Sequence, residues 1–103
     1  MSGFVFHPDA ITDLVEIWEF IAADNPDDAD RVLQEIETAL HALVTFPQQG
    51  HSRRDLTSRP LKFHIVREFL IAYTPSDQPL LVIAVLHGRR NPRILASQLR
   101  DRK

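Results

Sequence analysis

The chain has 103 residues, of which 44% are hydrophobic and 25% charged, a composition that predicts one globular domain, residues 1–103, with one core. It has no cysteine, which excludes a disulfide framework and suits a reducing compartment. The opening residues lack the basic segment of a signal peptide, and no apolar run approaches the roughly 20 residues of a membrane helix, so we expect a soluble cytoplasmic protein without a membrane partner.

The formal net charge of −2 conceals a strong asymmetry between the two halves of the chain. Residues 1–50 contain one basic and ten acidic side chains, whereas residues 51–103 contain eleven basic and four acidic ones. Such a distribution indicates an acidic partner for the second half. The alternative is that the two halves attract each other and use their charge within the fold.

The first half predicts a short strand followed by an acidic helical hairpin. Residues 3–7 favour a strand that Pro8 ends, and a helix with apolar side chains at helical spacing follows. Asn25 and Pro26 then form the cap and first position of a second amphipathic helix, which should end within residues 46–50. We place Trp18 in the core of this hairpin and Phe20 at the margin of the core, rather than on a partner surface.

The second half predicts three strands and a short helix. Residues 51–60 are polar and read as a loop, after which strand-like runs occupy 61–66, 69–74 and 80–87. In the first run, inward Leu61, Phe63 and Ile65 should alternate with a solvated face of Lys62, His64 and Val66. The last run is apolar throughout, as an inner strand is.

A basic C-terminal helix should begin near residue 92, because Asn91 and Pro92 repeat the cap and first position seen at the second helix. The element order is therefore β-α-α-β-β-β-α. This order predicts an α+β fold in which the helical hairpin packs on an antiparallel sheet, with a short C-terminal helix.

The end of the last predicted strand carries the most distinctive residues. His87 and Gly88 are followed by Arg89 and Arg90, and the glycine permits a sharp turn that presents this charge to a partner. Alternatively, the two arginines pair with Glu68, Asp101 or the acidic hairpin. His87 has a side chain suited to acid–base chemistry, although a strand-end histidine with a hydrogen-bonded ring is the commoner case.

No metal or cofactor site is expected from this sequence. Cysteine ligands are absent, and the other four histidines lack the spacing of a zinc site. These histidines are His7, His41, His51 and His64.

Three segments in matching order resemble one known superfamily. They are "F.F.P.A..DL.EI..FIA.DNP..A.R", "L..FP..G..R.DL" and "FLIAY" followed by "LLVIAVLHGRR". Together they resemble the RelE/ParE superfamily, the toxins of bacterial type II toxin–antitoxin modules, over nearly the whole chain. The resemblance implies a cognate ParD-like antitoxin as partner.

The two branches of that superfamily imply different functions. RelE-like members are ribosome-dependent mRNA endonucleases, and they carry an arginine directly after the aromatic residue of the middle strand, where this chain has Leu70. An aliphatic side chain cannot stabilise the charged transition state of phosphoryl transfer. ParE-like members poison DNA gyrase by contact, and "FLIAY" and "VLHGRR" are closer to that branch.

The ParE-like resemblance implies an inhibitor without catalytic residues or cofactors, whose partners are the antitoxin and DNA gyrase, possibly DNA-bound. We assign target contact to His87, Arg89, Arg90 and Arg93, and antitoxin contact to Arg53, Arg54, Arg67 and Tyr73. Two alternatives stay open. One is an endonuclease in which Arg67, His87, Arg89 and Arg90 replace the missing arginine; the other is a degenerate module member that only binds antitoxin.

Overall fold

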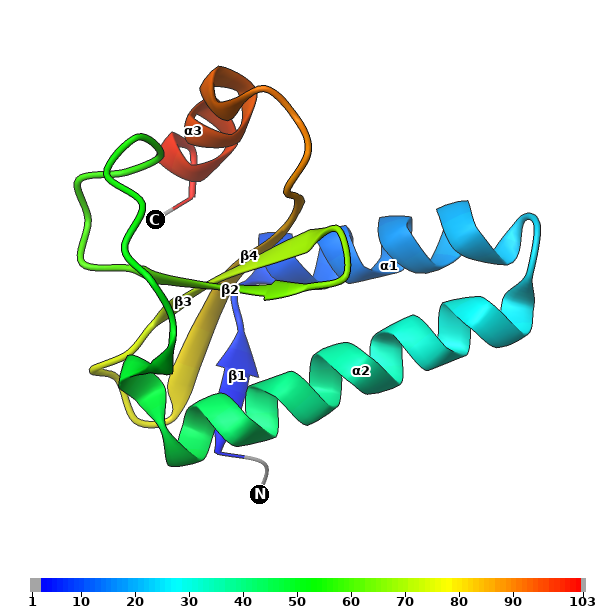
Figure 1. The fold of residues 1–103 in the computed structure, drawn as a ribbon, viewed down its shortest axis with the longest axis horizontal. Coiled ribbons are helices and arrows are strands. Elements are labelled where there is room, and N and C mark those ends of the chain that lie inside the picture. The colour runs from blue at the N-terminus through cyan, green and yellow to red at the C-terminus, as the bar shows by residue number, and fades with distance from the viewer. Residues whose placement is uncertain (1–2, 103) are drawn as a thin grey trace.

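The computed structural model describes residues 3–102 and has the predicted order of elements (Figure 1). A four-stranded sheet carries the helical hairpin on one face and the C-terminal helix on the other. A 3₁₀ turn at Pro47–Gln49 follows the second helix. The elements are β1 (Phe4–Phe6), α1 (Pro8–Ala22), α2 (Pro26–Thr45), β2 (Lys62–Val66), β3 (Phe69–Thr74), β4 (Leu80–His87) and α3 (Pro92–Arg100).

The α+β fold class is confirmed, but the sheet is mixed rather than wholly antiparallel. The strand order is β1-β4-β3-β2, in which β2, β3 and β4 form the predicted antiparallel meander. β1 pairs in parallel with the start of β4, where Phe4 lies opposite Leu80. The connection is long enough for a parallel pairing, because the chain passes through both hairpin helices and two more strands before it returns beside β1.

The predicted helix starts are confirmed at atomic detail. The Asn25 side-chain oxygen accepts a hydrogen bond from the backbone N–H of Asp28 at 3.1 Å, and Asn91 accepts one from Arg93 at 2.9 Å. Each cap is followed by a proline at the first helical position, where the missing N–H costs nothing.

The sheet divides the expected single core into two apolar layers. In one layer, the inward faces of α1 and α2 pack on the sheet through side chains such as Ile17, Ile36 and Leu40. In the other, Leu95 and Leu99 of α3, each 1% exposed, pack on the opposite face. β4 contributes to both layers, which explains why its sequence is apolar without interruption.

A β-bulge in β4 reverses which residues face the hairpin. Ala72 pairs with Ala84 while Tyr73 pairs with Val82, so Ile83 is an extra residue. Before the bulge Val82 faces the hairpin, and after it Val85 does. The same alternation brings His87 to the hairpin face instead of the α3 face.

The alternation predicted for β2 is wrong at its C-terminal end. β2 is an edge strand as expected, and Phe63 is buried, but Ile65 is 68% exposed and Val66 is buried. Phe63 packs in the α3 layer, whereas Ile65 has no such cover; Val66 belongs to the hairpin layer. The pattern of polar and apolar residues in a short strand does not reveal that other elements cover each face of the strand over only part of its length.

Candidate interaction surface

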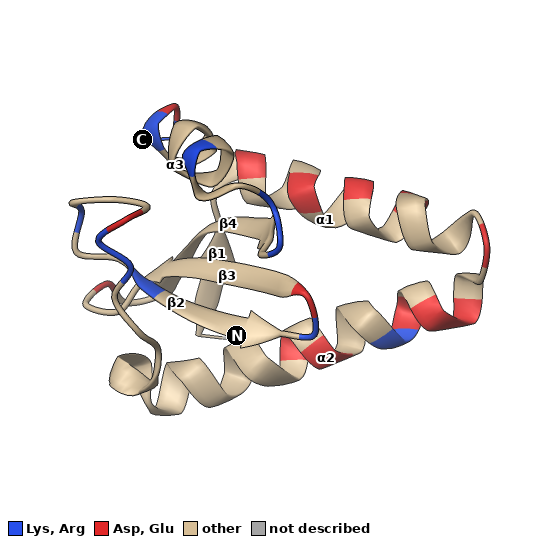
Figure 2. Cartoon of the chain, turned by 45° about the horizontal axis from the view of Figure 1, so that its top comes forward, with Lys and Arg blue, Asp and Glu red and all other residues tan. Residues whose placement is uncertain are grey.

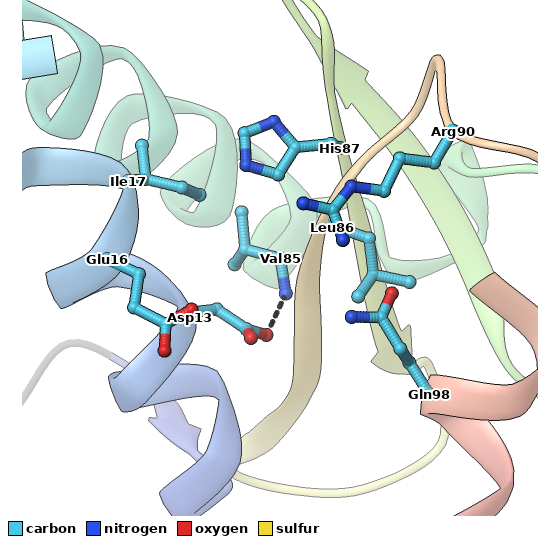
Figure 3. A pocket seen from close by; sticks show the side chains of 8 residues that line it. All are labelled: Asp13, Glu16, Ile17, Val85, Leu86, His87, Arg90 and Gln98. Atoms are coloured by element: carbon cyan, nitrogen blue, oxygen red, sulfur yellow. Dashed lines mark hydrogen bonds between the residues drawn. The ribbon is translucent and has the colours of Figure 1, made fainter. Parts of the chain in front are cut away.

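One carboxylate fixes the end of β4 (Figure 3). β1 pairs with β4 only as far as Val82, so the β4 backbone beyond it has no neighbouring strand on the side away from β3. Asp13 of α1 fills this gap, because its Oδ2 accepts a hydrogen bond from the Val85 N–H at 2.9 Å. The side chain of a helix thus takes the place of the missing strand at the edge of β4.

The same carboxylate holds the chain after α3. Asp13 accepts hydrogen bonds from both terminal nitrogens of Arg102, with Oδ1 and Nη2 2.9 Å apart. The side chains of Arg102 and Asp13 are 10% and 11% exposed, and this hydrogen bonding raises the pKa of Arg102 above its ordinary value. Arg59 adds a bond to the Arg102 carbonyl at 2.6 Å. The intervening segment is therefore anchored at both ends on Asp13.

Residues 88–100, which lie within this anchored segment, are called the basic arm below. It contains four arginines and no acidic residue. The four arginine side chains are exposed, and none of them forms an ion pair within residues 3–102. Figure 2 shows basic residues on α3 and on the loop before it, while acidic residues follow α1 and α2. The alternative in which Arg89 and Arg90 pair with Glu68, Asp101 or the hairpin is wrong for this structure.

His87 lies where the basic arm leaves the sheet. Its ring contacts Phe69 of β3 with centroids 5.2 Å apart and lies 6.5 Å from the ring of Phe20 on α1. Within residues 3–102 no group forms a hydrogen bond with this ring, so the commoner case of a hydrogen-bonded strand-end histidine does not hold here. Beside it, Glu16, Arg90 and other side chains line a recess of about 50 Å³ (Figure 3), enough for a water molecule or two rather than a nucleotide.

Arg67 lies at the same end of the sheet but is occupied within the fold. It stands at φ 55° in the β2–β3 turn. Its Nε and Nη2 bind the two carboxylate oxygens of Glu35 at 2.9 and 2.6 Å, and Nη1 lies 3.4 Å from Asp28. The bond from Arg67 lowers the pKa of Glu35. Arg67 thereby joins the turn to α2, which leaves less of its guanidinium for substrate or partner.

The other residues assigned to antitoxin contact differ in availability. Arg53 forms a two-bond pair with Asp55 at 2.9 and 2.8 Å, whereas Arg54 is exposed without an ion pair among the described residues. Tyr73 is fully buried, and its hydroxyl donates to the Pro47 carbonyl at 2.7 Å and accepts from Gly50 N–H at 3.0 Å. Tyr73 is corrected to a core residue, since a side chain with no exposed surface cannot contact a partner in this state.

Sequence reasoning missed the role of Asp13 and Arg102 and misplaced Phe20. Phe20 was expected at the margin of the core but is 75% exposed. Asp13 and Phe20 are seven residues apart on α1, so they share the helix face that lies along β4. That spacing was the available signal, although it becomes meaningful only once the neighbouring strand is known.

The hairpin has a second apolar surface on its outer side. Trp18 is partly exposed rather than in the core, and its Nε1 donates to Asp30 at 2.9 Å. Ile11 and Val15 of α1 are 51% and 52% exposed. Together with Leu14, Trp18 and Leu33 they line a groove of about 370 Å³, called the hairpin groove below.

Two absences concern only residues 3–102. That part of the chain contains no group of three or more His, Asp or Glu side chains arranged to hold a metal ion. Nor does any of its helices combine the length and apolar character needed to cross a membrane.

The comparisons with known proteins first define the class, which is the toxin component of a type II toxin–antitoxin module. The chain is 32% identical over 87 residues to "Putative toxin Y4kP" of Sinorhizobium fredii, covering 84% of this chain and 88% of that protein. It is 35% identical over 72 residues to Toxin ParE3 of Caulobacter vibrioides, covering 69% and 67%.

The family follows from a match over most of the chain. The model described as "ParE toxin of type II toxin-antitoxin system, parDE" matches residues 4–92, and the chain belongs to this family. Membership implies an antitoxin partner in the same module. The match includes the hairpin, the sheet and residues 88–92 of the basic arm, and it ends at the first residue of α3.

Proposed function

We propose that the protein is a ParE-like toxin that inhibits DNA gyrase by contact through the basic arm and His87, and that a ParD-like antitoxin neutralises it. The observation that carries the proposal is the set of four exposed arginines without ion-pair partners in the described chain, anchored at both ends on Asp13. Exposed cations stabilise a fold little, but they steer and orient an acidic partner. The proposed target contacts are His87, Arg89, Arg90 and Arg93.

The endonuclease alternative is disfavoured by the surroundings of two residues. Leu70 is 3% exposed and packs in the α3 layer, so its side chain lies in the core and not beside a substrate. Arg67 is held by Glu35 and Asp28. Loss of one well-placed electrostatic group costs about 10²–10³ in rate, and here a second cation is also occupied.

The hairpin groove suits the antitoxin. An amphipathic segment that folds on contact can lay apolar side chains over Ile11, Val15 and Trp18 while its polar side meets the acidic rim of α1 and α2. Arg53 and Arg54, on the central loop, are proposed contacts for acidic antitoxin residues. Co-expression of the neighbouring antitoxin should restore growth and yield a stoichiometric complex. The absence of any neighbouring gene product that binds the toxin would contradict this part of the proposal.

Charge reversal in the basic arm tests the target assignment. We expect wild-type protein to inhibit supercoiling by purified gyrase, and the Arg89→Glu/Arg90→Glu variant to lose inhibition because attraction becomes repulsion. The melting temperature should be unchanged, since neither arginine contributes an ion pair. Arg31→Glu/Arg54→Glu is the control matched in charge, as it reverses the same amount of charge at exposed positions outside the arm. Because Arg31 lies 3.9 Å from Asp28, the melting temperature of this variant is measured alongside its inhibition.

Three results would contradict the assignment. Wild-type protein at micromolar concentration without effect on gyrase would exclude gyrase as the target. Equal loss of inhibition in the control variant would show that net charge, rather than the basic arm, is responsible. Cuts in ribosome-bound transcripts, mapped by primer extension within minutes of induction, would favour the endonuclease alternative.

A further inference from the structure

Phe20 is the most exposed of the large hydrophobic residues in the described chain. It is 75% exposed, ahead of Ile65 at 68% and Phe46 at 66%. Its ring meets the edge of His87 at 85° and stays outside both apolar layers. The fold therefore gains little from an aromatic side chain at this position.

The location of Phe20 connects it to the basic arm. It lies near the end of α1, four residues after Glu16, which lines the recess beside His87 and Arg90. The start of the arm is fixed nearby, because the Gly88 N–H donates to the Glu68 carbonyl at 2.8 Å. An exposed aromatic ring and exposed arginines are thus held at the same end of the sheet by α1, β4 and the β2–β3 turn.

The chemistry of this combination distinguishes two kinds of partner. Aromatic residues and arginine are the side chains that contribute most to protein–protein interfaces, where an aromatic ring fills a desolvated pocket. A duplex phosphate backbone offers hydrogen-bond acceptors and negative charge but no apolar pocket. Glu16 and Glu19, both exposed on α1 beside Phe20, would also repel phosphate, whereas they can pair with basic side chains of a protein.

We propose that Phe20 is the apolar anchor of the target-binding surface, and that the target presents a protein pocket rimmed by carboxylates. The ring enters the apolar pocket, and Arg89 and Arg90 meet the acidic rim. This inference rests on the proposed role of the basic arm in target binding. The inference adds Phe20, from the acidic half of the chain, to the proposed target contacts. It also specifies that the protein recognises a protein surface instead of DNA.

The test compares two exposed phenylalanines. Phe20→Ala should raise the concentration needed for half-inhibition of gyrase about 30-fold, the order of loss for a truncated aromatic anchor. Phe46→Ala is the matched control: it removes the same side chain at similar exposure from the opposite end of the hairpin. Both variants should keep the wild-type melting temperature and antitoxin affinity, and Phe20→Trp should retain most of the inhibition.

Each other outcome is decisive. Wild-type inhibition by Phe20→Ala, or an equal loss in Phe46→Ala, overturns the proposal while the assignment of the arm stands. Weaker antitoxin binding by Phe20→Ala places Phe20 in the other interface and also overturns it. A loss of binding to free duplex DNA, measured by fluorescence anisotropy without gyrase, favours nucleic acid over a protein pocket.

A second readout separates two possible errors, a wrong target and a wrong role for Phe20. If wild-type protein leaves gyrase active, growth arrest in cells without antitoxin becomes the readout. Arrest lost in Phe20→Ala and kept in Phe46→Ala then supports an anchor for a different protein. Arrest kept in both variants overturns the proposal.

Discussion

Two arginine-bearing regions of this molecule use the same side chain for different purposes. In residues 53–67, three of the four arginines are engaged within the fold: Arg53 pairs with Asp55, Arg59 binds the Arg102 carbonyl, and Arg67 binds Glu35 and Asp28. Arg54 is the exception, since it is exposed without an ion pair among the described residues. In the basic arm, the four arginines have no ion-pair partner within the described residues. Part of the positive charge of the second half therefore belongs to the fold, and the surface available to a partner is smaller than the charge count indicates.

Arg102 marks the boundary between the two uses. It lies two residues after the arm, yet it is almost buried against Asp13. If the distinction is sound, substitutions of paired groups should change stability, and substitutions in the arm should change activity alone.

The largest effect on stability is expected from Asp13→Ala. This change leaves the Val85 N–H without its acceptor. It also removes the two-bond carboxylate partner of Arg102, which keeps only the Ile83 carbonyl at 3.3 Å and Asp9 at 3.9 Å. Breaking a buried ion pair costs about 3–5 kcal/mol, and we expect about 3 kcal/mol, the lower end, because each side chain retains some exposure. Urea denaturation measures the loss. Asp13→Asn keeps an acceptor for Val85 and should lose less; stability within about 0.5 kcal/mol of wild type for Asp13→Ala would refute the anchoring role.

A smaller effect is expected from Arg67→Gln. Its pair with Glu35 is solvent-exposed, so water and salt screen the attraction. The denaturation midpoint should fall by much less than in Asp13→Ala, and the difference from wild type should shrink further in 1 M salt. A loss equal to that of Asp13→Ala, and insensitive to salt, would show that the two pairs do not differ as proposed.

The smallest effect concerns pH and His64 of β2. Burial, followed by the nearby charge of His51, lowers the pKa of His64 from its ordinary value near 6.5. The folded state therefore binds a proton less readily than the unfolded chain. The contribution of His64 to the free energy of unfolding is fully present above about pH 6.5 and declines as the pH falls below that value. His64→Gln should flatten the decline in melting temperature between pH 7.5 and 5.5; an identical decline in both proteins would contradict it.

The sequence predicted the elements closely where local chemistry determines them. Asn25 and Asn91, each followed by proline, specify helix starts without reference to the rest of the fold. The uninterrupted apolar run correctly identified β4 as an inner strand, but the same uniformity hid the bulge at Ile83, because no alternation existed for an extra residue to disturb.

The parts that could not be predicted depend on residues far apart in the chain. Asp13 and Arg102 are separated by 89 positions, and nothing in either neighbourhood indicates the other. Phe20 was misplaced because helical spacing identifies the main apolar stripe of α1 but not whether a second element covers the residues beside it. The arm could be located in the sequence from its arginines. Only the structure shows that these arginines form no ion pairs with carboxylates among the described residues.

The central place of β4 in the sheet also orders events during synthesis. β4 is the last strand in the chain, yet β1 and β3 both pair with it. A ribosome therefore completes the acidic hairpin while β1 has no partner, and the sheet closes only after residues 80–87 emerge. Such distant pairing is slow to form. The hairpin therefore emerges first, and the basic arm, the surface proposed above to meet the target, can be held in place only after β4 has joined the sheet.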